Sequence, residues 1–159
     1  MSLAILPGSY DPMTLGHLDL VERALKEFDE VVVAVMVNPQ KQTRFDMERR
    51  VEIAKRTVAH LSHVRVISDT GMLIDLFDRL GADAVCKGYR NEKDYQYEVG
   101  MADWNAEHNP RFRTVLYPAS EKYAAISSTA VREQMETGGV LEELVHPNAL
   151  SLITEVPRL

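Results

Sequence analysis

The residues best suited to chemistry lie in the stretch PGSYDPMTLGH, residues 7–17, which directly follows an apolar run. Gly8 and Gly16 would allow the backbone to approach a ligand closely. A helix that begins near Gly16 or His17 would direct its backbone N–H groups and the positive end of its dipole toward the same point. These features favour a phosphate, with a ring nitrogen of His17 as a donor. The alternative is an ordinary turn rich in proline and glycine, and neither GxxxxGK(S/T) nor GxGxxG occurs here.

Two other groups of polar residues could belong to the same site. Lys41, Lys87 and Arg90 each come shortly after an apolar run that is typical of a strand. In a parallel sheet such positions meet at the carboxyl edge, where ligands bind. The hydroxyl residues 127–129 stand at the start of a late helical stretch, where such residues usually serve as N-caps. Solvated charges and simple caps are the alternatives to a phosphate site.

Five apolar runs predict the strands that would position these groups. They cover 2–6, 30–37, 64–68, 83–86 and 113–117, and several are β-branched and apolar on both faces. Such strands suit a parallel sheet covered on both sides. Three groups of apolar residues at helical spacing lie between them: Val21, Ala24, Leu25 and Phe28; Met47, Val51, Ala54, Val58 and Leu61; Leu73, Leu76, Phe77 and Leu80.

This alternation predicts an α/β fold, a Rossmann-like, doubly wound, parallel five-stranded sheet. C-terminal helices would follow the fifth strand. One is expected over 127–136, with Gly138 and Gly139 as a stop, and a short final helix would have Pro147 in its first turn.

Composition narrows the class of protein. The chain has 159 residues, 45% hydrophobic and 26% charged, so we expect one domain spanning 1–159. No stretch approaches the roughly 20 apolar residues of a membrane span, and we expect no secretory signal. The single cysteine, Cys86, cannot form an internal disulfide, which favours a protein of the reducing cytoplasm. Its side chain is expected to be a small buried apolar group. The net charge of −6 argues against nonspecific nucleic-acid binding.

Two motifs resemble the signatures of the nucleotidyltransferase superfamily. GSYDP with TLGH, residues 8–12 and 14–17, resembles its TxGH loop, and ISSTAVR, residues 126–132, resembles its ISSTxVR segment. The block KGYRNEKDYQYE, residues 87–98, is similar to the RGLRxxxDFxYE block of the phosphopantetheine adenylyltransferase family. NPQK, residues 38–41, matches that family's lysine-bearing loop. The resemblance covers essentially the whole chain.

The resemblance implies transfer of the adenylyl group of ATP to 4′-phosphopantetheine by direct in-line attack. The products would be dephospho-coenzyme A and pyrophosphate, in coenzyme A biosynthesis. It also implies Mg²⁺ as the partner of the triphosphate, with no metal ligand assigned, and a homohexamer. Because both reactants are polyanions, the protein has to supply positioning and charge stabilisation more than a nucleophile.

The resemblance also implies the roles of individual residues. The catalytic residues would be His17, which stabilises charge on the α-phosphoryl group, and Lys41, which contacts the transferring phosphates. The residues that bind 4′-phosphopantetheine would be Ser9, Lys41, Leu73 and Lys87. The residues that bind ATP would be Ser9, Tyr10, His17, Gly88, Tyr89, Arg90, Glu98, Tyr123, Ala124, Ala125, Ile126, Ser127, Ser128 and Thr129.

The chain departs from the family's pattern at a few positions. Lys87 stands where the family usually has arginine, so a compact ammonium group replaces a planar guanidinium group that could donate through two N–H groups at once. Ser9 replaces a frequent threonine, and Trp104 and Ala106 interrupt the usual MAxMNR run. The alternative functions are a related nucleotidyltransferase for nicotinate mononucleotide or a phosphorylated alcohol, a nucleotide sensor without turnover, and an α/β scaffold. The 87–98 block disfavours the first, and the presence of both His17 and Lys41 disfavours the second. Two spaced phosphate motifs disfavour the scaffold.

Overall fold

Five parallel strands form the centre of the molecule, seen here in a computed structural model that describes residues 2–154. Their order in the sheet is β3-β2-β1-β4-β5. The strands are β1 (Leu3–Gly8), β2 (Glu30–Met36), β3 (Val64–Asp69), β4 (Ala84–Tyr89) and β5 (Thr114–Pro118). The chain moves outward from β1 to β3, returns to the other side of β1 and continues to β5. This confirms the predicted doubly wound fold.

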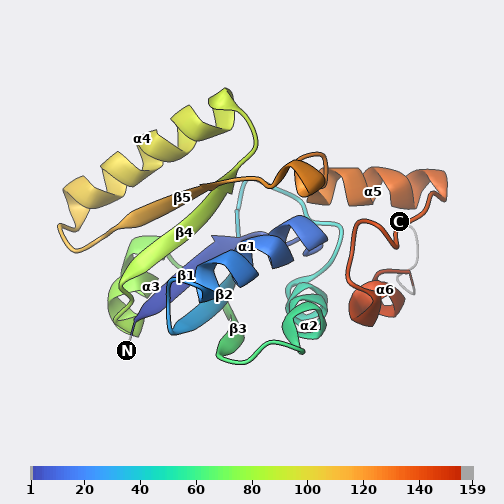
Figure 1. The fold of residues 1–159 in the computed structure, drawn as a ribbon, viewed down its shortest axis with the longest axis horizontal. Coiled ribbons are helices and arrows are strands. Elements are labelled where there is room, and N and C mark those ends of the chain that lie inside the picture. The colour runs from blue at the N-terminus through green and yellow to red at the C-terminus, as the bar shows by residue number, and fades with distance from the viewer. Residues whose placement is uncertain (1, 155–159) are drawn as a thin grey trace.

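Helices connect the strands and continue after β5. They are α1 (Leu15–Leu25), α2 (Met47–Val58), α3 (Leu73–Leu80), α4 (Glu92–His108), α5 (Ser128–Thr137) and α6 (Pro147–Thr154), with a 3-10 turn η1 (Glu121–Tyr123). Figure 1 shows α5 and α6 at one end of the molecule and α3 at the other. The two C-terminal helices confirm the prediction, because α5 ends at Gly138 in the left-handed conformation and α6 begins with Pro147.

The sheet is covered on both faces, which explains its uninterrupted apolar strands. Along β1, Leu3 and Ile5 belong to one core together with Phe77 of α3. Ala4 and Leu6 belong to the other core, which contains the buried faces of α1, α2, α5 and α6. Because successive side chains of a strand point to opposite faces, β1 contributes to both cores.

Strands β1 and β4 extend two and three residues further than predicted. β1 pairs with β2 as far as Gly8, and β4 pairs with β5 as far as Tyr89. Lys87 therefore lies within β4, not after a strand as its apolar flank suggested, and Arg90 is the first residue beyond β4. Helix α4 was not predicted as a helix. Its apolar side chains do not form a buried face, because only Glu98 and Asn105 of this helix are buried.

The sheet order determines where a ligand can bind. The direction of winding reverses between β1 and β4, which are direct neighbours. In open α/β sheets the crevice outside the carboxyl ends at such a reversal is the usual ligand site. Across residues 2–154, no helix combines the length and apolarity needed to cross a membrane.

Candidate active site

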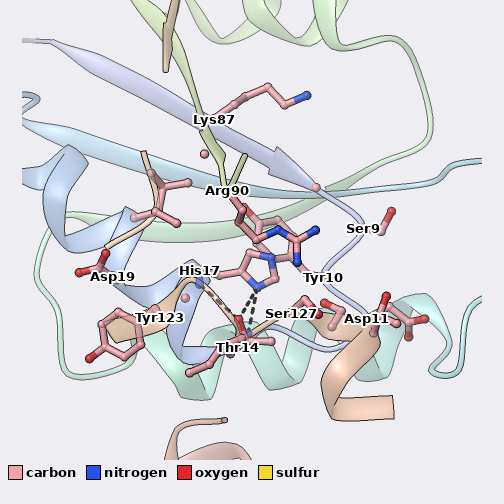
Figure 2. Close-up of a pocket in the computed structure, with 18 of the residues that line it drawn as sticks. Ser9, Tyr10, Asp11, Thr14, His17, Asp19, Lys87, Arg90, Tyr123 and Ser127 are labelled. Atoms are coloured by element: carbon pink, nitrogen blue, oxygen red, sulfur yellow. Dashed lines mark hydrogen bonds between the residues drawn. The ribbon is translucent and has the colours of Figure 1, made fainter. Parts of the chain in front are cut away.

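A cavity of about 640 Å³ opens at this reversal point. Its walls come from the loop after β1, the first turns of α1, the end of β4 and the segment from η1 into α5. Figure 2 shows His17, Arg90, Thr14 and Ser127 gathered in this space. A second cavity of about 170 Å³ adjoins it, and Ser9 and Lys87 line both cavities. Leu73 lines only the smaller one. The larger volume is in the range of small-molecule sites.

The local fold fixes the tautomer of His17. Thr14 is the N-cap of α1, and the backbone N–H of Thr14 donates to Nδ1 of His17 over 2.9 Å. The Thr14 hydroxyl in turn accepts from the His17 backbone N–H, which completes a capping box in which histidine takes the usual place of glutamate. A backbone amide can only donate, so Nδ1 is the acceptor and the neutral ring carries its proton on Nε2.

Burial keeps this imidazole neutral. Desolvation, and then the positive charge of nearby Arg90, lower the pKa of His17 from 6.5 to about 4. The ring also packs edge-on against Tyr10, with the ring centroids 4.8 Å apart. At neutral pH His17 is therefore a hydrogen-bond donor through Nε2 and carries no formal charge.

Tyr10 adopts an unusual backbone conformation to support that ring. Its φ is +48°, which is uncommon for a residue other than glycine, and its hydroxyl donates to the carbonyl of Leu6 at 2.7 Å. A Cβ at Gly8 would lie 3.1 Å from the Tyr10 ring. A side chain at position 8 would therefore crowd Tyr10, while Gly8 itself lines both cavities and its approach to a phosphate stays a prediction.

Asp11 ties three segments of the site together. Its two carboxylate oxygens accept from the backbone N–H groups of Arg44 and Phe45 at 2.8 and 2.9 Å. Its carbonyl accepts from Arg132 of α5 at 2.7 Å, and Ser128 donates to the carbonyl of Pro12 at the same distance. The first loop therefore fixes both the loop before α2 and the start of α5.

The hydroxyl residues at the start of α5 are partly engaged within the protein. The Ser127 side chain accepts from the Ala130 N–H at 3.0 Å as an N-cap, and Thr129 accepts from Arg132 at 3.1 Å. The cap interpretation is therefore correct for Ser127. All three residues also line the larger cavity, so the helix start faces the same space as His17.

The basic residues have different surroundings. Lys41 is exposed in the loop between β2 and α2 and lines the larger cavity. Arg90 directly follows β4, and its Nε lies 3.5 Å from Oδ2 of Asp94 in α4. Lys87 forms a 2.8 Å ion pair with Glu98, whose side chain is only 9% exposed. Figure 2 shows the Lys87 side chain apart from the group around His17.

Comparisons with known proteins agree with this geometry. The sequence model of the cytidylyltransferase-like family matches residues 5–134. A protein of Heliobacterium modesticaldum named phosphopantetheine adenylyltransferase is 41% identical over 98% of this chain and 92% of its own length. A protein of the same name from Clostridium botulinum is 40% identical over 95% of both chains. The chain belongs to the phosphopantetheine adenylyltransferase family.

A solved structure confirms the fold of this family member. A putative nicotinate-nucleotide adenylyltransferase from Vibrio parahaemolyticus superposes with a TM-score of 0.75, covering 98% of this chain and 93% of that one. At 19% sequence identity the likeness concerns the fold alone.

Most of the residues singled out in the sequence meet at the larger cavity of this phosphopantetheine adenylyltransferase family member. Its lining includes Ser9, Tyr10, His17, Lys41, Lys87, Gly88, Tyr89, Arg90, Tyr123, Ile126, Ser127, Ser128 and Thr129. Leu73 lines the smaller cavity instead. Glu98, Ala124 and Ala125 line neither, and their contacts with ATP stay predictions.

Some polar residues of the site were not identified in the sequence. Asp19 lines the larger cavity, accepts from Ser120 at 2.7 Å and lies 3.6 Å from Arg23. Asp11 and Arg132 belong to the motifs that were recognised, but their structural roles were not predicted. Charged residues on a helix or in a turn are usually solvated, so only the three-dimensional contacts distinguish these.

Proposed function

We propose that this protein transfers the adenylyl group of ATP to 4′-phosphopantetheine, giving dephospho-coenzyme A and pyrophosphate, a step of coenzyme A biosynthesis. The observation that carries the proposal is the neutral imidazole of His17, which lines the larger cavity together with the starts of α1 and α5 and carries its proton on Nε2. The names of the relatives, at about 40% identity over nearly the whole chain, support the choice of reaction.

The two adjoining cavities suit two polyanionic substrates. ATP would occupy the larger cavity, with its phosphates at the starts of α1 and α5, where backbone N–H groups and helix dipoles favour negative charge. 4′-Phosphopantetheine would lie toward Leu73 in the smaller cavity. Ser9 and Lys87 line both spaces, so the acceptor phosphate would meet the nucleotide beside them.

The proposed reaction is a direct in-line displacement. An oxygen of the acceptor phosphate attacks the α-phosphorus, the bond from that phosphorus to the bridging oxygen of the β-phosphate breaks, and pyrophosphate leaves with the electron pair. The acceptor is already ionised, so no general base is needed. His17 donates through Nε2 to a non-bridging α-oxygen as negative charge builds there, while Lys41 and Arg90 offset the charge of the phosphates.

Mg²⁺ belongs to the proposal as the partner of the triphosphate. Among residues 2–154, no three His, Cys, Asp or Glu side chains gather in a way that could hold a metal ion. Because Mg²⁺ is usually held by substrate phosphates with at most one or two carboxylates, the ion would enter with the nucleotide. Its contribution would be to neutralise phosphate charge.

We further propose a homo-oligomer, a hexamer as the family resemblance implies, in the cytoplasm. Helix α4 exposes Tyr97, Met101 and Trp104, with 65%, 40% and 43% of these residues accessible. Their spacing places them along one side of α4 as a surface for a second copy. Light scattering of the purified protein tests the assembly, and a monomeric mass contradicts it.

The proposed function is tested by pyrophosphate release. Purified protein with ATP and Mg²⁺ is offered 4′-phosphopantetheine, nicotinate mononucleotide or a phosphorylated alcohol in parallel. We expect release with the first acceptor. Release with nicotinate mononucleotide and none with 4′-phosphopantetheine would contradict the proposal.

A further inference from the structure

A buried arginine lies directly behind the loops of the site. Arg50, in the first turn of α2, is only 4% exposed. Its Nη1 donates to the carbonyl of Ser9 at 2.8 Å, and its Nε donates to the carbonyl of Phe45 at 3.1 Å. A longer contact of 3.5 Å joins Nη1 to the carbonyl of Met36. Arg50 appears in neither cavity lining, so it has no direct access to a substrate.

The three carbonyls mark the boundaries of the two loops that carry the proposed chemistry. Met36 ends β2 and Phe45 comes just before α2, so Arg50 holds both ends of the loop that bears Lys41. Within that loop the N–H groups of Gln40 and Lys41 donate back to Asn38, whereas those of Arg44 and Phe45 donate to Asp11 of the first loop. Ser9 belongs to the other loop, after β1. Arg50 therefore connects the two loops through their carbonyls, as Asp11 does through the amides of Arg44 and Phe45.

The charge of Arg50 makes its placement costly. None of the ion pairs found among residues 2–154 includes it. It also stands in the first turn of a helix, where the dipole disfavours a cation, and burial of a charge without a counter-ion is unfavourable. A buried cation at this point adds positive potential behind Ser9, on the side where an anionic substrate would bind.

We propose that Arg50 is a positioning residue of the adenylyl-transfer site. By donating hydrogen bonds to the carbonyls of Ser9, Met36 and Phe45, it holds the loop that bears Lys41 in place relative to the first loop. The expected effect of Arg50 on catalysis rests on the proposed function. Its expected effect on the position of the loops rests on the loop contacts alone. The two can be tested separately.

The kinetic test uses Arg50→Met, which keeps much of the side-chain volume and removes the donors and the charge. We expect kcat to fall about tenfold to a hundredfold, because small misplacements of a catalytic group cost this much, while the KM for ATP changes less than about threefold. Arg50→Lys retains the positive charge but has fewer donors, so its kcat should lie between that of Arg50→Met and that of the wild type. The matched control is Arg56→Met, an exposed arginine on the same helix paired with Glu52, which should leave kcat unchanged.

A double-mutant cycle separates positioning from general damage. If Arg50 acts through Lys41, Arg50→Met lowers kcat much less in a Lys41→Ala background than in the wild type. An equal loss in both backgrounds overturns the proposal. Hydrogen exchange of the Arg44 and Phe45 amides gives a readout without substrate: both should exchange faster in Arg50→Met, and unchanged rates overturn the proposal. If wild-type protein fails to use 4′-phosphopantetheine, the proposed function fails while this exchange test still decides the role of Arg50. Should Arg50→Met not fold, Arg50→Lys is measured by the same criteria.

Discussion

The two nitrogens of His17 have separate tasks, and a pair of substitutions can separate them. Nδ1 accepts from the buried Thr14 N–H at 2.9 Å, whereas Nε2 carries the proton that the proposed reaction needs. Asparagine places its side-chain oxygen near the position of Nδ1, and glutamine places its amide near the position of Nε2. His17→Asn should therefore keep the cap of α1 and lose the donor. His17→Gln should keep the cap through its side-chain oxygen, because glutamine is a usual residue at this position of a capping box, and it still presents an amide donor.

The magnitudes follow from these contacts. Removing one preorganised donor to a transition-state oxyanion typically lowers kcat by about 10²–10³-fold, which is the loss expected for His17→Asn. Its free energy of unfolding should stay close to that of the wild type. In His17→Gln the buried Thr14 N–H can keep an acceptor in the glutamine side-chain oxygen, so the stability of this variant should also stay close to that of the wild type. The loss of kcat in His17→Gln should be smaller than in His17→Asn.

Pyrophosphate release gives kcat and KM for both variants, and urea unfolding gives their stability. The order of kcat should be wild type, His17→Gln, His17→Asn, while the stability of both variants should stay close to that of the wild type. A His17→Asn enzyme with wild-type kcat would refute the reasoning. So would an unchanged kcat accompanied by a large rise in the KM for ATP, because His17 would then act in ground-state binding.

Three further outcomes are expected. His17 has a pKa of about 4 in the folded protein and its ordinary value of 6.5 when unfolded, so between these pH values the unfolded chain binds one more proton than the folded chain. The free energy of unfolding of the wild type should therefore fall relative to that of His17→Asn by about 1–3 kcal/mol as the pH drops from 6.5 to 4. Equal pH profiles of the two proteins in urea unfolding would contradict this. Lys87→Arg should keep or lower the KM for 4′-phosphopantetheine, since a guanidinium can engage a phosphate through two donors, and a sharp rise would show a pocket built around lysine. Asp11→Asn retains one acceptor where the carboxylate has two, so it should cost about 1–3 kcal/mol in unfolding free energy and lower kcat; unchanged values would show that Asp11 does not hold the loop before α2.

The sheet and the location of the site could be predicted because they depend on strong local signals. Apolar runs on both faces mark buried parallel strands, and the turn after the first of them places His17 at the carboxyl edge. The phosphate motifs are far apart in the chain but short and distinctive. Their convergence follows once β1 is central and α5 packs against its end of the sheet.

The supporting contacts could not be predicted because they depend on long-range geometry. Arg50 looks like one of several cations in α2, and nothing in its sequence neighbourhood indicates three carbonyl partners. The contact between the Tyr10 ring and the space beside Gly8 was not predicted either, because it depends on the left-handed conformation of Tyr10. Helix α4 has no buried apolar face, and neither the helix nor the pairing of its Glu98 with Lys87 was expected.

The most direct test of the central claim is the mass of the product formed from ATP and 4′-phosphopantetheine with Mg²⁺. Adenylyl transfer predicts dephospho-coenzyme A in an amount equal to the pyrophosphate released. Formation of pyrophosphate and free AMP without that adduct, or no reaction while nicotinate mononucleotide is adenylylated, would contradict the account.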